Sequence, residues 1–591
     1  MSFKPAAAAI AGALMAFTHF GPASAAQTFH PGDRITGDHF ATRSTIQAVN
    51  GAAASAQPLA TMVGIDILKA GGNAVDAAIA MNAAIGLMEP VGNGIGGDIF
   101  VLVYDPETRQ VYGLNGAGRS PMGLDIETVR ERLTDQGTIP PVGALPVSVP
   151  GTVDGWFTLH ERFGQMPMED ILAPAIRYAE EGFPVSQTIA FYWERNMRIL
   201  QQRYDDGQFE EFDNARATYL NAEGRAPAEG EIFRNPDLAR TFRMLATGGR
   251  DAFYEGEIAR TMDAYMRRIG GWLRYEDFAA HRSEWVDPVT VNYRGYDVWQ
   301  IPPQGQGMSV LQMLQILEGY DLASMGYMSA DALHVMIEAK RLAFEDRARF
   351  YADPAYQPAP VEWLLSDEYA DERRALISMD RAMEHVGPGD PPQIEHNDTT
   401  YLTVADSNGM MVSLIQSNYR GMGAGVVPDG LGFMFQNRGE AFSMDEGHPN
   451  VYEPGKRPFH TIIPGMVTYN DEGYLSFGVM GGGMQPQGHV QVLVNMIDFG
   501  LNLQQAGDAA RWRHEGSTEP TDDLGAPAGL GRVHLESGVP EEVRAELERR
   551  GHVIARSDGG FGGYQAVRRD PVTGVLSAAS EMRTDGAAMG Y

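Results

Sequence analysis

The chain contains no cysteine among its 591 residues, which excludes disulfide bonds, iron–sulfur clusters, thiolate zinc sites and a cysteine nucleophile. Basic residues are scarce as well: 46 lysines and arginines face 77 aspartates and glutamates, for a formal net charge of −31. Nucleic acids and anionic membranes are bound through basic patches, so neither is expected as a partner. The acidity is interpreted as a means of keeping a large protein soluble.

Long hydrophobic runs are also missing. The apolar run over residues 6–17 is too short to span a bilayer. It follows Lys4 and precedes the small residues Ala23-Ser24-Ala25, a pattern typical of a secretory signal peptide. We therefore predict that residues 1–26 form a leader and that the mature protein is periplasmic or secreted, without membrane attachment.

Two familiar site motifs are excluded by context or by spacing. The glycine cluster over 92–97 matches GxGxxG, but a predicted helix over 74–88 precedes it and a predicted strand over 99–104 follows it. A dinucleotide site needs the opposite order. The 14 histidines show no His-Glu-x-x-His or comparable spacing, so no metal site and no cofactor are predicted.

Helical patterns dominate the first two thirds of the chain. Residues 150–261 are predicted to be mostly helical, and 331–351 to form an amphipathic helix with charges opposite its apolar positions. These charges are Glu338, Lys340, Arg341 and Glu345. A connector rich in proline, glycine and acidic residues follows over 378–398 and is predicted to be flexible.

Strand patterns dominate the remainder. Runs over 401–405 and 411–416 flank Asn408-Gly409, a strong hairpin signal. Further strands are predicted near Val467 and over 475–479 and 489–494, with helices over 503–511 and 540–550. This mixture predicts one large mixed sandwich rather than a string of separate domains.

The junction Asp398-Thr399-Thr400 lies where the connector meets the first of these strands. Threonine is a poor nucleophile, but an N-terminal threonine carries its own base, because its freed α-amine has a pKa of roughly 7.7–8.0. One cleavage before Thr399 would therefore create a catalyst. Taken alone, the two threonines are better explained as ordinary β-branched strand residues.

Segments along nearly the whole mature chain resemble the γ-glutamyltranspeptidase family. They cover 71–78, 149–153, 172–176, 311–320 and 340–347, with Asp398-Thr399-Thr400 and Gly481-Gly482-Gly483 in the expected order. The resemblance implies an α+β fold, the four-layer αββα sandwich of the N-terminal-nucleophile hydrolases. It also implies a precursor that cuts itself between Asp398 and Thr399, giving a large subunit over 27–398 and a small subunit over 399–591.

The same resemblance assigns the catalytic roles. Thr399 is the nucleophile and its α-amine the general base. Ser417 stands where the family has a second threonine that hydrogen-bonds to the nucleophile. Gly481 and Gly482 match the glycine pair that forms the oxyanion hole.

The match is weaker in the pocket for the substrate's glutamate head group. The family's arginine for the α-carboxylate corresponds to Ala117, with Arg119 two residues on, and its acid for the α-amine corresponds to Ala441, beside Glu440. Arg438 replaces a neutral amide, His460-Thr461 replace a serine pair, and Tyr419 replaces an asparagine beside Asn418. The candidate substrate-binding residues are Arg119, Asn418, Tyr419, Arg438, Glu440, His460 and Thr461.

The resemblance implies an exported γ-glutamyltransferase or glutathione hydrolase. Such an enzyme passes a γ-glutamyl group from glutathione or related small amides to water or amino acids through an acyl-enzyme. The altered pocket leaves open a glutaryl-type amidohydrolase, similar to cephalosporin acylases, because glutaryl differs from γ-glutamyl only by the amine. A non-catalytic periplasmic binding homologue, with the fold but no processing, is the alternative from another class.

Overall fold

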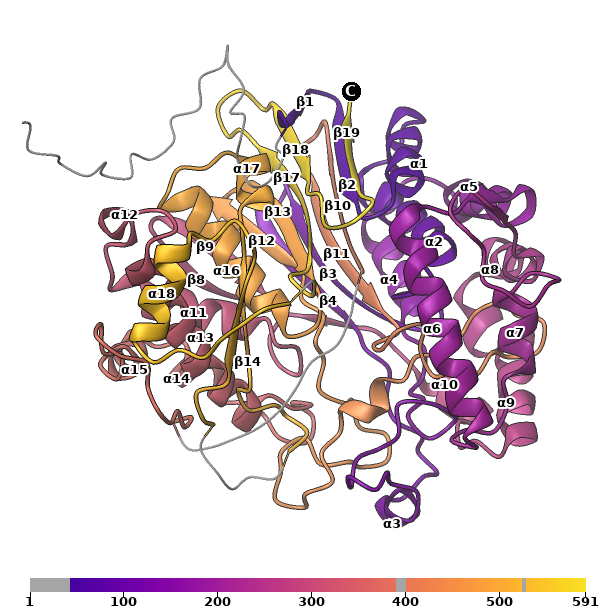
Figure 1. Cartoon of the computed structure of the whole chain (residues 1–591). Helices are drawn as coiled ribbons and strands as arrows, with labels where there is room; N and C mark the ends of the chain where they lie inside the picture. The colour runs from indigo at the N-terminus through magenta and orange to yellow at the C-terminus, as the bar shows by residue number, and fades with distance from the viewer. Residues whose placement is uncertain (1–42, 390–399, 523–527, 558) are drawn as a thin grey trace, which may run out of the picture.

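Two antiparallel sheets of seven strands each stack face to face at the centre, and helices cover both outer faces (Figure 1). This computed structural model describes residues 43–389, 400–522, 528–557 and 559–591. The predicted leader and the junction Asp398-Thr399 lie outside the described residues. The four layers confirm the predicted αββα sandwich.

The two sheets are built from strands far apart in the sequence. The first sheet has the order β19 (Ala587–Gly590), β2 (Gly51–Ser55), β10 (Thr400–Asp406), β11 (Met411–Ser417), β3 (Asp98–Asp105), β4 (Gln110–Gly116) and β7 (Glu284–Val286). The second has the order β1 (Ile46–Ala48), β18 (Leu576–Ser580), β17 (Gly563–Arg569), β13 (Glu472–Met480), β12 (Gly465–Tyr469), β9 (Tyr296–Gln300) and β8 (Val289–Tyr293).

The hairpin β10–β11 was predicted from its Asn-Gly turn, and it lies in the middle of the first sheet. Its register pairs Thr400 with Gln416. Because successive side chains of a strand point to opposite faces, Tyr401 and Ala405 pack between the sheets, whereas Leu402 and Val404 face the helices. Tyr401 and Leu402 are almost completely buried, so both faces of β10 contribute to a core.

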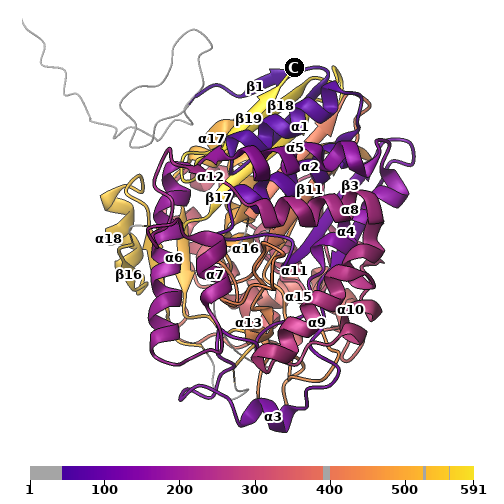
Figure 2. The same cartoon turned by 90° about the vertical axis from the view of Figure 1, so that its right-hand side faces the viewer.

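The helices divide into two outer layers, each packed on its own sheet. The layer on the first sheet, facing the viewer in Figure 2, contains α1 (Pro58–Lys69), α2 (Ala74–Met88), α4 (Thr152–Phe163), α5 (Met168–Glu181), α6 (Gln187–Asp205), α7 (Asp213–Tyr219), α8 (Pro236–Tyr254), α9 (Glu257–Ile269) and α10 (Tyr275–Ala280). The layer on the second sheet contains α11 (Met308–Glu318), α12 (Leu322–Met325), α13 (Ala330–Phe350), α14 (Val361–Leu364), α15 (Asp367–Arg374), α16 (Met484–Ile497), α17 (Leu503–Asp508) and α18 (Glu541–Arg549).

Short elements complete the described chain. They are α3 (Ile126–Arg130), the 3-10 turn η1 (Arg438–Ala441), and the strands β5 (Phe183–Pro184), β6 (Ile232–Phe233), β14 (Trp512–Glu515), β15 (Arg532–Leu535) and β16 (Ile554–Ala555). Within the described ranges, every helix is too short or too polar to cross a bilayer.

Two sequence predictions about these elements were wrong. Residues 489–494, predicted as a strand, lie inside α16, because a short apolar run does not by itself distinguish a strand from a buried helix. The charges of the predicted amphipathic helix are buried along α13 instead of facing solvent. Glu338 binds Arg341 at 2.7 Å, and the Lys340 ammonium donates to Ser517 Oγ at 2.9 Å.

Candidate active site

The candidate site lies where β10 of the first sheet begins and β13 of the second sheet ends. Thr400, the first residue of β10, accepts a hydrogen bond at Oγ1 from Asn93 Nδ2 at 3.3 Å. Asn93 belongs to the glycine cluster between α2 and β3. The predicted nucleophile Thr399 precedes Thr400 directly and lies outside the described residues.

Ser417 is the last residue of β11 and is completely buried. It follows Gln416, the ladder partner of Thr400, and so lies at the end of the hairpin where β10 begins. Its Oγ accepts the backbone N–H of Tyr419 at 2.8 Å. On the other side, Ser417 pairs with Asp98 of β3.

Gly481 and Gly482 form the turn between β13 and α16. Both have positive φ, +121° and +56°, which favours glycine. Their carbonyl oxygens accept hydrogen bonds from the helix that follows, from Met484 N at 3.0 Å and Gln485 N at 3.1 Å. The chain at this point is therefore bent back tightly beside the start of β10.

Four of the predicted head-group residues cluster beyond Ser417. Arg438, in the turn η1, is completely buried. Its Nη1 donates to Thr461 Oγ1 at 2.9 Å, and its guanidinium lies 4.1 Å from the ring centroid of Tyr419. Its Nε and Nη2 have no hydrogen-bond partner among the described residues. Burial lowers the pKa of Arg438 to about 10, so it stays cationic at neutral pH.

His460 completes this cluster and is held by an acid that the sequence analysis missed. Its Nε2 lies 3.0 Å from Asp98 Oδ2, so Nε2–H donates to the carboxylate. Burial lowers the pKa of His460 to about 4, which leaves the ring neutral. In the part of the chain that the structure describes, its Nδ1 has no partner. The only sequence signal for Asp98 was its position at the start of a buried strand.

Glu440, the candidate partner for an ammonium group, is already paired with a cation. One of its oxygens lies 2.8 Å from Arg420 Nε. Burial raises the pKa of Glu440 to about 7. Asn418 donates its backbone N–H to the carbonyl oxygen of Gly92 at 3.0 Å and its Nδ2 to the carbonyl oxygen of Met422 at 3.2 Å.

Arg119 binds residues outside the cluster around Arg438. Its guanidinium lies 3.2 Å from carboxylate oxygens of both Asp353 and Glu284, and it also donates to the carbonyl of Gly455. Glu284 also binds Arg457. This network joins β7 to the segments that contain Asp353 and Arg457, and a substrate role for Arg119 stays an untested prediction.

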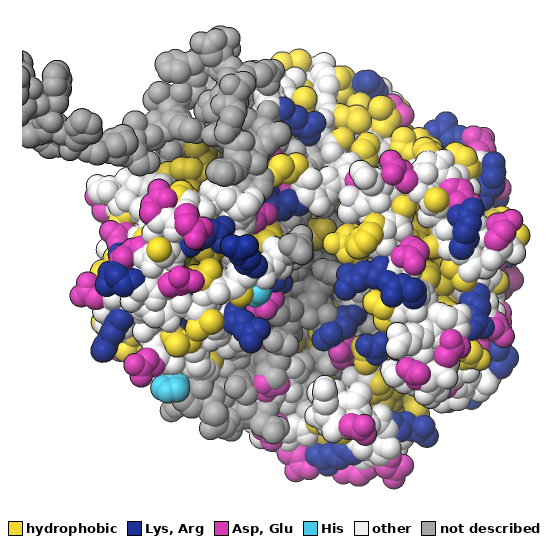
Figure 3. Space-filling model, viewed as in Figure 1, with side chains coloured by type: hydrophobic (Ala, Val, Ile, Leu, Met, Phe, Trp, Pro, Cys, Tyr) yellow, Lys and Arg dark blue, Asp and Glu magenta, His cyan; other side chains and the backbone are white. Residues whose placement is uncertain are grey.

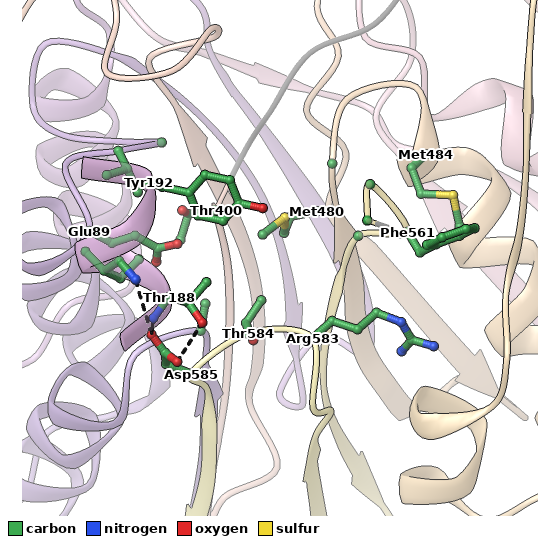
Figure 4. A pocket seen from close by; sticks show the side chains of 18 of the residues that line it. Glu89, Thr188, Tyr192, Thr400, Met480, Met484, Phe561, Arg583, Thr584 and Asp585 are labelled. Atoms are coloured by element: carbon green, nitrogen blue, oxygen red, sulfur yellow. Dashed lines mark hydrogen bonds between the residues drawn. The ribbon is translucent and has the colours of Figure 1, made fainter. Parts of the chain in front are cut away.

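A cavity of about 660 Å³ opens at Thr400 and Gly481 (Figure 4). One wall is a continuous face of α6, from which Tyr192 points into the space toward Met480 at the end of β13. None of these wall residues was predicted from the sequence, because a helix face that lines a cavity has the same pattern as one that faces solvent. The lining consists of Ala56, Glu89, Val91, Gly92, Thr188, Ile189, Tyr192, Arg195, Asn196, Thr400, Met480, Gly481, Met484, Arg513, Glu536, Ser537, Ser557, Gly559, Gly560, Phe561, Gly562, Arg583, Thr584 and Asp585.

The chain is similar to known proteins over most of its length. The family model of gamma-glutamyltranspeptidase matches residues 60–591. A glutathione hydrolase-like proenzyme of Bacillus subtilis, YwrD, is 35% identical over 539 residues, which cover 90% of this chain and 97% of its own. The acylase ACY 1 proenzyme of Pseudomonas sp. strain SE83 is 35% identical over 538 residues, or 90% of this chain and 91% of its own.

Among solved structures, a cephalosporin acylase from Bacillus halodurans has a TM-score of 0.86 and 44% identity, covering 95% of this chain and 99% of that one. The family model thus covers every described strand after β2, and these relatives match at least 90% of the chain. The chain belongs to the γ-glutamyltranspeptidase family of N-terminal-nucleophile amidohydrolases.

Proposed function

We propose that this protein is a self-activating amidohydrolase that removes carboxylate-bearing acyl groups from small amides. In activation, Thr399 Oγ attacks the Asp398 carbonyl, the acyl group moves from nitrogen to oxygen, and water hydrolyses the resulting ester. This frees the α-amine of Thr399 and leaves two subunits, 27–398 and 399–591. The names of relatives as proenzymes support such processing.

In turnover, the Thr399 oxygen attacks the substrate amide carbonyl while its proton passes to the α-amine. The proton then goes to the leaving nitrogen, the C–N bond breaks and an acyl-enzyme remains. Water, or an amine acceptor, attacks this ester and regenerates the threonine. Backbone N–H groups at Gly481 and Gly482 would bind the oxyanion, and Ser417 would hold the nucleophile by a hydrogen bond.

The proposed acyl preference rests on Arg438, because one edge of its guanidinium has no hydrogen-bond partner among the described residues. Nε and Nη2 form one side of the planar guanidinium, and both are buried without partners among the described residues. Leaving charged donors unsatisfied costs at least ~1–3 kcal/mol, whereas a carboxylate would accept both hydrogen bonds side by side. Glu440 is paired with Arg420, so it offers no free charge to an ammonium group. Both facts favour a glutaryl-type acyl group.

A γ-glutamyl group is the second candidate, and one observation favours it. Asn418 Oδ1 and His460 Nδ1 are buried acceptors without hydrogen-bond partners within the described ranges. An α-amine near them would supply the missing donors. Glutathione hydrolase or γ-glutamyltransferase activity would follow from that arrangement.

The first experiment is the intact mass of the purified protein under denaturing conditions. We expect two fragments, the smaller beginning at Thr399, and a single uncut chain for Thr399→Ala. An uncut wild-type chain would contradict the enzymatic proposal and favour the non-catalytic binding homologue.

The second experiment compares the p-nitroanilides of glutarate and γ-glutamate on the processed enzyme. We expect kcat/KM to be higher for the glutaryl substrate and to fall about 100-fold in Arg438→Gln, because a buried, charge-assisted pair is lost. Arg240→Gln, at an exposed ion pair with Asp237 on α8, serves as the control and should keep most activity. A preference for the γ-glutamyl substrate would establish the second candidate instead.

A further inference from the structure

The loop that precedes α11 contacts two separate parts of the candidate site. Gln306, in this loop, has no exposed area. Its backbone N–H donates to the carbonyl oxygen of His460 at 3.1 Å. Its side-chain Nε2 donates to the carbonyl oxygens of Thr461 at 2.6 Å and of Gly482 at 2.9 Å. One amide group thus joins the segment proposed to bind the acyl group to the turn proposed to bind the oxyanion.

The orientation of the Gln306 amide follows from its partners. Two carbonyl oxygens lie on one side and can only accept, so the NH₂ group faces them. On the other side, Arg347 Nη1 donates to Gln306 Oε1 at 2.7 Å. The reversed amide would place its oxygen against two carbonyl oxygens and its NH₂ group against a guanidinium. The amide is therefore satisfied in one orientation only.

Arg347 holds that orientation from within α13. Its guanidinium pairs with Glu519 and lies over the ring of Phe344, 4.0 Å from the ring centroid. Figure 3 shows charged side chains spread over the face that carries the central hollow, whereas Arg347 and Gln306 have no exposed area. Neither residue is among those that line the cavity. Both can therefore act on a substrate only through the groups that they hold.

The turn at Gly481 and Gly482 needs a restraint because it consists of glycine. Both residues have positive φ, and a chain without Cβ atoms has access to more backbone conformations than any other. Their carbonyl oxygens accept bonds from the first N–H groups of α16, the helix that continues the turn. The bond from Gln306 comes from outside α16. It fixes the turn relative to the segment that contains Thr461.

We propose that Gln306 is a positioning residue for amide hydrolysis, which sets where the oxyanion turn lies relative to the bound acyl group. The inference rests on the proposed function and adds to its site a residue that does not contact the substrate. Oxyanion donors must lie about 2.7–3.1 Å from the developing charge, so a small displacement of the turn lowers the rate. Arg347 supports this role, because it keeps the Gln306 amide in the productive orientation.

The test uses the processed enzyme and whichever p-nitroanilide, glutaryl or γ-glutamyl, the wild type hydrolyses faster. Gln306→Glu has nearly the same shape and keeps an oxygen for Arg347, but its carboxylate cannot donate to Gly482 or Thr461. We expect kcat to fall about 10- to 50-fold and KM to change less than about threefold, because the turn acts mainly in the transition state. Gln306→Met, which loses every bond of the amide, should lower kcat at least as far.

Gln312→Met is the matched control for Gln306→Met. Gln312 lies on α11, is buried, and also uses both ends of its amide. Its Nε2 donates to Asp346 at 2.9 Å and its Oε1 accepts from the Tyr351 hydroxyl at 2.6 Å. These partners do not line the cavity. We expect the two methionine variants to lose similar free energies of unfolding in denaturant, while Gln312→Met keeps its kcat.

A second readout does not depend on the leaving group. The boronic acid that matches the preferred acyl group is 4-boronobutanoate for glutaryl and its 2-amino derivative for γ-glutamyl. The Thr399 oxygen adds to boron while its proton passes to the α-amine, which gives a tetrahedral anion that mimics the oxyanion. We expect Gln306→Glu to weaken inhibition by the boronate about tenfold, and inhibition by the corresponding free acid, glutarate or glutamate, less than about twofold.

An unchanged kcat in Gln306→Glu, or equal weakening of the boronate and the free acid, would overturn the inference. For a variant that is not processed, amide hydrogen exchange compares Thr399→Ala precursors with and without Gln306→Met. Faster exchange over 481–485 is expected there, and unchanged exchange would also overturn it. Failure of the proposed function is distinguishable, because it would appear in the wild type as an uncut chain or as no turnover of either p-nitroanilide.

Discussion

Gly481 shows how strongly single residues are constrained at this site. Its φ of +121° is open to glycine but strained for other residues. An added Cβ would lie 3.2 Å from the Cα of Gly562 in the neighbouring loop. The backbone conformation at position 481 and the close approach of Gly562 therefore each favour glycine there, apart from any catalytic role.

Gly481→Ala is expected to lower kcat by about 10²–10³, the usual cost of losing one oxyanion donor, because the turn must shift. KM should change much less, since the donor acts mainly in the transition state. Steady-state kinetics of the processed variant measure both. Gly574→Ala, at another glycine with positive φ, is the control and should reduce stability without lowering kcat. An unchanged kcat in Gly481→Ala would argue against an oxyanion role.

Glu440 gives a prediction about pH. Burial raises its pKa from 4.5 to about 7, so between these values the folded protein holds a proton that the unfolded chain has released. The contribution of Glu440 to the free energy of unfolding is thus full below the lower value and declines as pH rises toward 7. Glu440→Gln should remove this decline. Chemical denaturation of both proteins across the window measures it, and parallel profiles would contradict the assignment.

The residues of the site differ in how far the sequence could predict them. Ser417, Arg438, His460 and Thr461 came from matching positions in a family pattern, and the structure brings them together. Asp98 was missed because its partner His460 is 362 positions away in the sequence. Contacts between such distant residues depend on sheet topology, which no local pattern contains.

At the scale of elements, the N-terminus of α6 is capped by a side chain near the C-terminus of the protein. Its N-cap residue Ser186 makes no capping hydrogen bond through its side chain. Asp585 instead accepts from the N–H groups of Thr188 and Ile189, at 2.8 and 3.4 Å, and its negative charge suits the positive end of the helix. The cavity wall is therefore fixed by the C-terminal segment.

Asp585→Ala should lower the free energy of unfolding by about 1–2 kcal/mol, as loss of a helix cap does. Asp585→Asn, which keeps one acceptor oxygen, should lose less. Denaturant titration of the three proteins provides the comparison. A smaller loss in the alanine variant than in the asparagine variant would show that the cap is not the source of the effect.

Sequence patterns predicted most elements and failed where burial overrides periodicity. All of the residues over 489–494 are buried within α16, including His489 and Gln491, so the alternating valines of this run have the pattern of a strand although the segment is helical. The charged side chains of α13 were predicted to face solvent. They are buried instead and form ion pairs such as Glu338–Arg341. Local composition does not distinguish a solvated charge from a paired one.

At the scale of the molecule, both sheets mix strands from before and after the proposed cleavage site. β10 pairs with β2, β11 with β3, and β12 with β9. We expect the two fragments to elute together in gel filtration and to unfold in one transition. We expect them to separate only in denaturant. Fragments that part under native conditions would contradict this interwoven topology.

If the chain is cut before Thr399 as proposed, the interleaved sheets give that peptide bond two roles at different times. While the chain folds, it holds the two halves together at an effective concentration in the millimolar range, which makes pairing of β10 with β2 an intramolecular event. Once the strands are in register, the peptide bond contributes little to assembly, and it only keeps the α-amine of Thr399 from acting as a base. If the two halves were made as separate chains, the second would begin with a free α-amine, but the halves would not be linked. Their assembly would then depend on concentration and would compete with aggregation of unpaired strand edges.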